Sequence, residues 1–132
     1  MKISSIVAGQ ELGQVQFDLD AALVQEYLSA VGDQSNIYAS DGPVPLTAVA
    51  ALGVRTVLGG LALPHGTVHV AQELVAHRMA ACGQSVSCQA RVAQASHRRE
   101  GTFLVLEFAV KDDAGQPVLD GRTTLMVPGP EA

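Results

Sequence analysis

The sequence predicts an α+β protein in which one antiparallel sheet wraps around a single buried helix. Helical spacing of apolar residues dominates the first half of the chain, whereas two-residue alternation dominates the second half. Residues 46–58 are apolar on nearly every face, which is typical of a helix that is buried on all sides. The chain has 132 residues, and we expect residues 1–132 to form one domain.

Two segments of the first half have helical patterns. The first is "FDLDAALVQEYLSAVGD" at 17–33, with Asp20 as the predicted N-cap and Gly32 as the predicted C-terminal stop. Its apolar residues at helical spacing are Leu23, Val24, Tyr27, Leu28 and Val31. The second is the buried helix at 46–58, which ends before a pair of glycines and carries Arg55 as its single charge.

The second half of the chain reads as strands. Residues 85–95 alternate as in a half-buried strand, and 102–110 are nearly all apolar, as in a central strand covered on both faces. Residues 118–128 form the last predicted strand, and a short strand is expected near 13–18. The pattern at 67–78 fits helix or strand, and we assign a strand because the later strands need a partner. A sheet around one helix is the hotdog arrangement, which leaves a free sheet edge.

Composition limits the partners of the chain. Hydrophobic residues make up 48% and charged residues only 16%, which indicates that some apolar surface faces another chain; an alanine-rich surface is the alternative. The net charge is −5 and no basic cluster exceeds "HRRE" at 97–100, so we expect no nucleic-acid partner. No apolar run approaches the ~20 residues that span a bilayer, so we expect no membrane partner.

The cysteines and the N-terminus favour a cytoplasmic protein. Cys82 and Cys88 are six residues apart, which fits neither a CxxC redox motif nor a zinc knuckle, so we expect reduced thiols. The opening "MKISSIVAGQ" lacks the sustained apolar region of a signal peptide. The histidines form no HxH motif and have no carboxylate at ligand spacing, so we expect no metal and no cofactor.

Three stretches together resemble the MaoC-like acyl-thioester hydratase/dehydratase family. They are "YLSAVGDQSNIY" at 27–38, "HVAQELVAHRMAACGQSV" at 69–86 and "REGTFLVLEFAVKDDAGQPVLDGRTTLMVP" at 99–128. The resemblance extends from Gly13 to Pro128. It implies a hotdog fold, association with another hotdog chain as a homo- or hetero-oligomer, and enoyl or 3-hydroxyacyl thioesters of CoA or acyl carrier protein as ligands.

The catalytic motif of the family is incomplete in this chain. Active members of the family carry D-x4-H, in which Asp orients water and His is the general acid/base. Asp33 matches the Asp, whereas Tyr38 stands at the His position, and a phenol with a pKa near ~10 is a poor base at neutral pH. The resemblance therefore implies a non-catalytic half, in which Asp33 is a remnant. Asn36 and Tyr38 match such halves, although Ile37 replaces their usual proline.

Further residues are candidates for contacts with a thioester. The candidate substrate-binding residues are Asn36, Leu46, Thr47, His69 and Arg78. In the family, a backbone N–H at the start of the buried helix donates to the thioester carbonyl. Pro43 and Pro45 each lack an N–H, so we expect this oxyanion site to be degraded.

Several of these residues also have a simpler structural interpretation. Asp33 could form an Asx turn after the first helix. Arginines 78, 98 and 99 could contact CoA phosphates or be plain surface charges. His65 is expected in a solvated turn and His97 at a solvated strand end. His69 and His77 are expected on the same face of one strand, with structural hydrogen bonds.

Four functions remain open at this stage. The favoured one is a non-catalytic, acyl-thioester-binding subunit of a heteromeric hydratase/dehydratase. The alternatives are a self-sufficient (R)-specific enoyl-CoA hydratase that uses Asp33 with a displaced histidine, a hotdog thioesterase, and a purely structural or binding module. The buried helix offers no carboxylate to activate water, which is evidence against the thioesterase.

Overall fold

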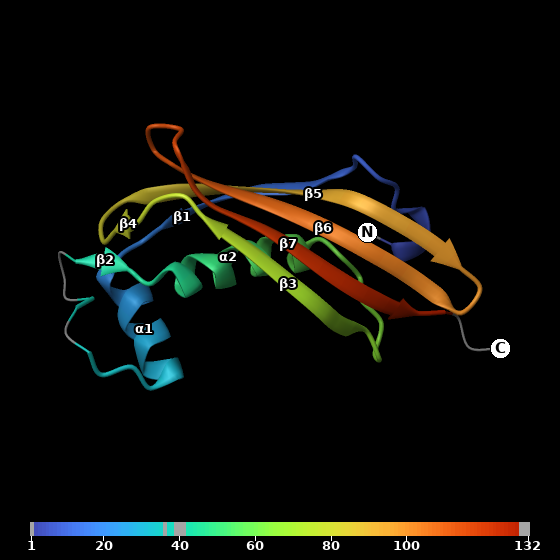
Figure 1. Cartoon of the computed structure of the whole chain (residues 1–132), viewed down its shortest axis with the longest axis horizontal. Coiled ribbons are helices and arrows are strands. Elements are labelled where there is room, and N and C mark those ends of the chain that lie inside the picture. The colour runs from blue at the N-terminus through green and yellow to red at the C-terminus, as the bar shows by residue number, and fades with distance from the viewer. Residues whose placement is uncertain (1, 36, 39–41, 130–132) are drawn as a thin grey trace.

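The computed structural model describes residues 2–35, 37–38 and 42–129. Figure 1 shows one curved sheet with its helices on one side. In chain order the elements are η1 (Ile3–Ser5), β1 (Glu11–Asp18), α1 (Ala21–Val31), β2 (Pro43–Val44), α2 (Leu46–Gly59), β3 (Val68–Ala76), β4 (Ala80–Ala81), β5 (Ser85–Arg98), β6 (Gly101–Asp112) and β7 (Pro117–Pro128).

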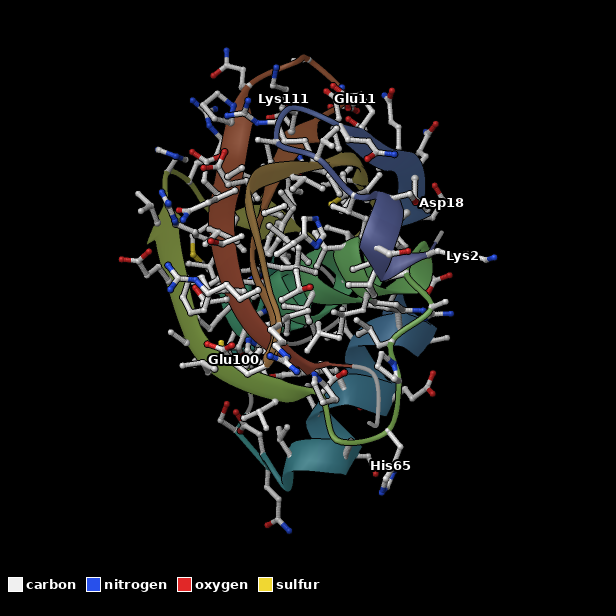
Figure 2. All side chains as sticks on the ribbon, turned by 90° about the vertical axis from the view of Figure 1, so that its right-hand side faces the viewer. Lys2, Glu11, Asp18, His65, Glu100 and Lys111 are labelled. Atoms are coloured by element: carbon white, nitrogen blue, oxygen red, sulfur yellow. The ribbon has the colours of Figure 1, made fainter. Side chains whose placement is uncertain are left out.

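The main sheet has five strands in the order β1-β5-β6-β7-β3, and all neighbours are antiparallel. Helix α2 lies in the concave side of this sheet (Figures 1 and 2). A second sheet of two strands joins β2 to β4. The predicted α+β arrangement of a sheet around a helix is confirmed.

Helix α1 begins and ends where the sequence predicts. The Leu23 N–H donates to Asp20 Oδ1 at 2.8 Å, which satisfies a first-turn amide that has no intrahelical acceptor. Gly32 has a φ of 72°, and its N–H donates to the carbonyl oxygens of Leu28 and Ser29. Glycine adopts this left-handed conformation without the steric cost of a side chain.

Two glycines allow α2 to pack closely on the sheet around Phe108. Phe108 lies on β6 and is only 2% exposed. A Cβ atom on Gly53 of α2 or on Gly121 of β7 would lie 2.1 Å from the Phe108 ring. The ring therefore fills space that both glycines leave free, and larger residues at either position would force the helix and sheet apart.

One side of α2 is not covered by the residues that the structure describes. The buried residues of the helix are Ala48, Val49, Ala50, Leu52, Gly53, Thr56 and Val57. Thr47, Ala51 and Arg55 are four residues apart and exposed, so they form one stripe along the helix. The prediction of burial on all sides is wrong for this stripe, because the sheet covers α2 from one side only.

Strand β3 is an edge strand. The strand predicted at 67–78 is confirmed. It pairs with β7 and lies at the end of the strand order of the main sheet. A bulge interrupts its register between His69 and Ala71. Nearly all its residues are exposed, including Val68, Val70, Leu74 and Val75. The sheet thus has a free apolar edge.

Candidate functional site

The start of helix α2 presents backbone N–H groups. Pro45 is the N-cap, and its carbonyl accepts from the N–H groups of Ala48 at 2.9 Å and Val49 at 3.3 Å. No described residue accepts from the N–H of Leu46 or Thr47, which lie in the first turn. These two amides carry the positive end of the helix dipole and suit a carbonyl or oxyanion.

The prolines do not degrade this helix start. Pro43 lies in β2 and Pro45 is the N-cap, so the missing N–H groups precede the first turn of α2. The expectation that "GPVPL" removes the oxyanion donors is therefore wrong. Proline before or at the first helical position leaves the later first-turn amides intact.

A hydroxyl pair that the sequence analysis missed lies at the same helix start. Tyr27 of α1 donates its phenol O–H to Thr47 Oγ1, with the two oxygens 2.5 Å apart. Tyr27 is half-buried and Thr47 is exposed. The helical spacing of Tyr27 with apolar residues predicted a core position and contained no signal for a partner twenty residues away.

Asp33 and Tyr38 make separate contacts in the structure. Asp33 is exposed and its Oδ1 accepts from the Ser35 N–H at 2.8 Å, which is the Asx turn considered as the simpler interpretation. Tyr38 is half-buried and packs against the hydrophobic core. Asn36 lies outside the described residues.

His69 and His77 lie on opposite faces of the sheet, contrary to prediction, because the bulge after His69 shifts the alternation. His69 Nε2 donates to Gln72 Oε1 at 3.0 Å on the core-facing side, where Gln72 also accepts from buried Thr123. His77 Nε2 lies 2.8 Å from exposed Asp120.

His69 is also remote from the start of α2. It precedes Ala76 by seven residues along β3, or roughly 23 Å. Figure 1 shows α1, β2 and β4 gathered beyond the Ala76 end of the sheet. The structure therefore does not bring His69 to the other candidate site residues of the same chain.

The remaining two histidines are also elsewhere. His97 is not a simple solvated residue: its Nε2 donates to the Ile6 carbonyl at 2.8 Å, and its Nδ1 accepts from Thr102 Oγ1 at 3.1 Å. It ties the N-terminal segment to the β5–β6 hairpin. His65 is exposed in the predicted turn, and Figure 2 shows it at the rim of the molecule.

Of the candidate arginines, Arg78 alone lies at the end of the sheet where α2 begins. It precedes β4 by two residues, and Ala80 of β4 pairs with Val44, two residues before α2. The Arg78 N–H donates to the carbonyl of Val118, and the next residue, Leu119, aligns across the sheet with Val110 and Cys88. Arg98 lies at the far tip, ten residues along β5 from Cys88, or roughly 33 Å. Arg78 and Arg98 of one chain therefore cannot hold the same phosphate.

The described part of the chain has few other reactive groups. Both cysteines are free, and burial raises the pKa of the Cys88 thiol, partly offset by a hydrogen bond with the Thr56 side chain. Within the described residues, no three metal-binding side chains cluster. No helix there is long and apolar enough to cross a bilayer.

The architecture of the chain is a hotdog fold, shared with several solved structures. R-hydratase PhaJ1 from Pseudomonas aeruginosa superposes with a TM-score of 0.78 at 17% identity, over 97% of this chain and 86% of that one. The (R)-hydratase of A. caviae involved in PHA biosynthesis gives 0.77 at 18%, over 94% and 98%. The HadBC (3R-hydroxyacyl-ACP dehydratase) complex of Mycobacterium tuberculosis gives 0.69 at 20%, over 92% and 98%.

The chain belongs to the family of the FAS1-like dehydratase domain region, whose model matches residues 6–121. This match confirms the resemblance to MaoC-like hydratases and dehydratases. No curated protein matches the sequence.

Proposed function

We propose that this chain binds enoyl or 3-hydroxyacyl thioesters of CoA or acyl carrier protein and is not catalytic by itself. In this proposal it pairs with a second hotdog chain that supplies the Asp and His of a hydratase/dehydratase. One observation carries the proposal: the start of α2 keeps its hydrogen-bond donors, while Tyr38 stands at the family's histidine position and His77, the histidine next to Arg78, pairs with Asp120 on the outer face of the sheet.

The chemistry of hydration explains why this arrangement favours binding without turnover. Water must lose a proton as it adds to C3, while C2 gains one, so an acid/base group must contact the water. Asp33 Oδ1 accepts from Ser35, and Tyr38 stands where the family has histidine. The amides of Leu46 and Thr47 still suit a thioester carbonyl, and Arg78 at the same end suits a ligand phosphate.

The free edge of β3 supports association with another hotdog chain. A long apolar edge strand is a template for pairing with another strand, and isolated proteins usually protect such edges. The HadBC neighbour is, by its description, a complex of a hydroxyacyl-ACP dehydratase. We assign the proposed contact with the partner to β3.

The Tyr27–Thr47 hydroxyl pair favours a second candidate, a self-sufficient hydratase. The Tyr27 O–H donates to Thr47, so Tyr27 would act through Thr47 as a proton donor near the carbonyl. Asp33 would then have to leave its turn and act as the base. This candidate departs from the family chemistry in two ways, a tyrosine as proton donor and an Asp33 that leaves its turn, whereas the binding subunit requires neither.

The test measures binding and turnover separately with the purified chain. We expect crotonyl-CoA to bind in calorimetry, while loss of the enoyl absorbance stays ~10²–10⁴-fold below a working acid/base enzyme. Leu46→Pro removes one first-turn N–H at a position where helices accept proline, and should weaken binding about tenfold. Leu46→Ala keeps the N–H and is the matched control.

Two outcomes would contradict the proposal. Substantial hydration by the homogeneous chain, lost in Tyr27→Phe, would establish the self-sufficient enzyme instead. Equal binding by Leu46→Pro and Leu46→Ala would show that the start of α2 does not hold the thioester. Tyr38→His restores the histidine of the family motif and leaves the first-turn amides unchanged. The turnover of this variant therefore measures what the missing base contributes.

A further inference from the structure

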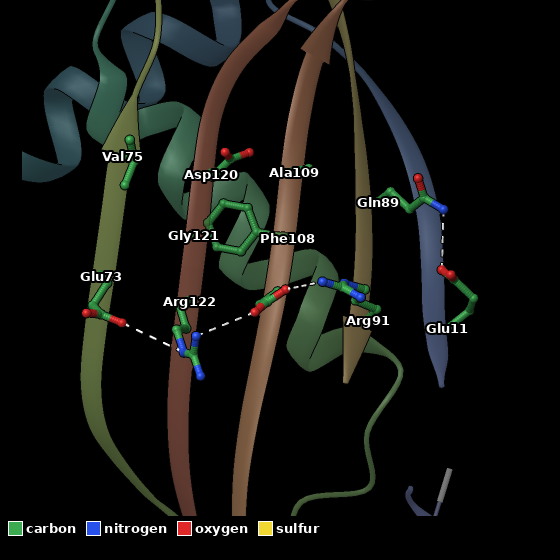
Figure 3. A pocket seen from close by; sticks show the side chains of 11 residues that line it. Glu11, Glu73, Val75, Gln89, Arg91, Phe108, Ala109, Asp120, Gly121 and Arg122 are labelled. Atoms are coloured by element: carbon green, nitrogen blue, oxygen red, sulfur yellow. Dashed lines mark hydrogen bonds and ion pairs between the residues drawn. The ribbon is translucent and has the colours of Figure 1, made fainter. Parts of the chain in front are cut away.

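A row of alternating charges crosses the outer face of the sheet, on the side away from α2 (Figure 3). Its members, one on each strand, are Glu73 on β3, Arg122 on β7, Glu107 on β6, Arg91 on β5 and Glu11 on β1. They stand directly opposite one another in the strand registers. The ion pairs join Arg91 to Glu107 at 2.7 Å, Arg122 to Glu107 at 3.6 Å and Arg122 to Glu73 at 3.8 Å.

Within the row, each inner charge lies between two opposite charges. Arg122 lies between Glu73 and Glu107, and Glu107 lies between Arg122 and Arg91. Glu73 has an arginine on one side only, because no described strand pairs with the other edge of β3. Its side chain is 73% exposed. At the free edge, the row therefore ends in the Glu73 carboxylate, which has an oppositely charged side chain on one side only.

We propose that Glu73 selects the partner of β3: a hotdog chain of different sequence that places Lys or Arg opposite Glu73, in preference to a second copy of this chain. The inference rests on the part of the proposed function that assigns association to β3. Charge complementarity supports it, because a cation at this position extends the alternation by one strand. The exposed valines and leucine of β3 would be covered by the same strand.

A second copy cannot supply this cation. Residues directly opposite in an antiparallel pair face the same side of a sheet. If each α2 stays on the same side of a continuous sheet, only the outer positions of a second β3 can oppose Glu73. Within β3 these are Val68, Ala71, Glu73 and Val75, none of which is basic, and His77, on the same face just beyond β3, is held by Asp120. Self-pairing would therefore place an apolar side chain or a second carboxylate opposite Glu73, and like charges there oppose pairing.

The experiment supplies the missing cation on a surrogate partner. Wild-type chain is immobilised and titrated with wild type, Ala71→Lys, Glu73→Lys or Val75→Lys, which place lysine at three outer positions in turn. We expect at least one lysine variant to bind wild type up to about fivefold tighter than wild type binds itself. Glu73→Gln should also self-associate more tightly than wild type.

The matched control is Glu11→Lys, the same charge change at the opposite end of the row, which should bind wild type as wild type does. Thermal melts of all variants check that each is folded. Equal binding by the three lysine variants, the control and wild type would overturn the proposal. If the β3 amides that do not bond β7 gain no protection from exchange in any mixture, β3 is not the associating edge. That outcome would contradict both the role of Glu73 and the proposed partner contact through β3. Thioester binding is tested separately by calorimetry.

Discussion

Strands β6 and β3 are both rich in apolar residues, yet their side chains differ sharply in exposure. On β6, Leu104 and Leu106 are fully buried, whereas on β3 Leu74 is 44% exposed and Val75 56% exposed. β6 has β5 and β7 on its two sides and α2 beneath it, whereas among the described strands β3 pairs with β7 alone. The burial of a strand thus depends on its neighbours, and an apolar strand with one neighbour indicates a missing partner.

The largest expected effect tests the helix that covers β6. Ala50 of α2 is 6% exposed, while the next residue, Ala51, lies on the exposed stripe. Ala50→Asp should unfold the protein, because an unpaired buried carboxylate costs several kcal/mol. Ala51→Asp should change the free energy of unfolding by less than about 0.5 kcal/mol in a urea titration. Similar melting of Ala50→Asp and the parent would refute the burial of α2.

Truncating one leucine on each strand compares β6 and β3 directly. Leu106→Ala should lower the free energy of unfolding by about 2–5 kcal/mol, because it leaves a cavity in a packed core. Leu74→Ala in the isolated chain should cost less than about 1 kcal/mol, since Leu74 is already 44% exposed and loses little buried area. Association through β3 should enlarge the Leu74→Ala effect, so the two variants are measured at low and high protein concentration.

The close packing of α2 on β6 can be tested at Gly53. Gly53→Ala adds a Cβ that meets the Phe108 ring, and overpacking of this kind costs about 1–3 kcal/mol. Gly59→Ala, in the last turn of the same helix, meets nothing within 4 Å and should be neutral or stabilise by up to about 1 kcal/mol. Equal thermal stability of the two variants would mean that the helix does not approach the sheet as closely as the structure indicates.

The smallest expected effect concerns the outer row. Arg91→Ala removes the 2.7 Å ion pair with Glu107, but the Arg91 side chain is 58% exposed. Solvent screening limits such a pair to about 0–1 kcal/mol, and the loss should shrink further at high salt. A loss of several kcal/mol would indicate that the outer face is covered in solution, unlike the free face of the single chain.

Local patterns predicted the elements that depend on near neighbours in the sequence. Asp20 and Gly32 marked the ends of α1, because a cap and a left-handed turn involve only adjacent residues. The alternation at 85–95 and the apolar run at 102–110 identified β5 and β6. The order of motifs along the chain was enough to identify the family that residues 6–121 match.

Of the candidate site, the sequence predicted residue types but not their arrangement. Tyr38 at the histidine position was visible in the motif itself, and the Asx turn at Asp33 follows from residue type. The Tyr27–Thr47 pair was not predictable, since it depends on how α1 packs against the start of α2. The separation of His69 from His77 was also missed, because a bulge depends on the register with β7.

By itself, the sequence determined the fold class, the buried helix and the incomplete catalytic motif, because each depends on residue type and short-range spacing. Only the tertiary structure decided that β3 is the free edge, that one stripe of α2 is exposed and that five charges align across the sheet. These features arise from strand order and register, which are determined by contacts between residues far apart in the chain. No local pattern encodes such contacts.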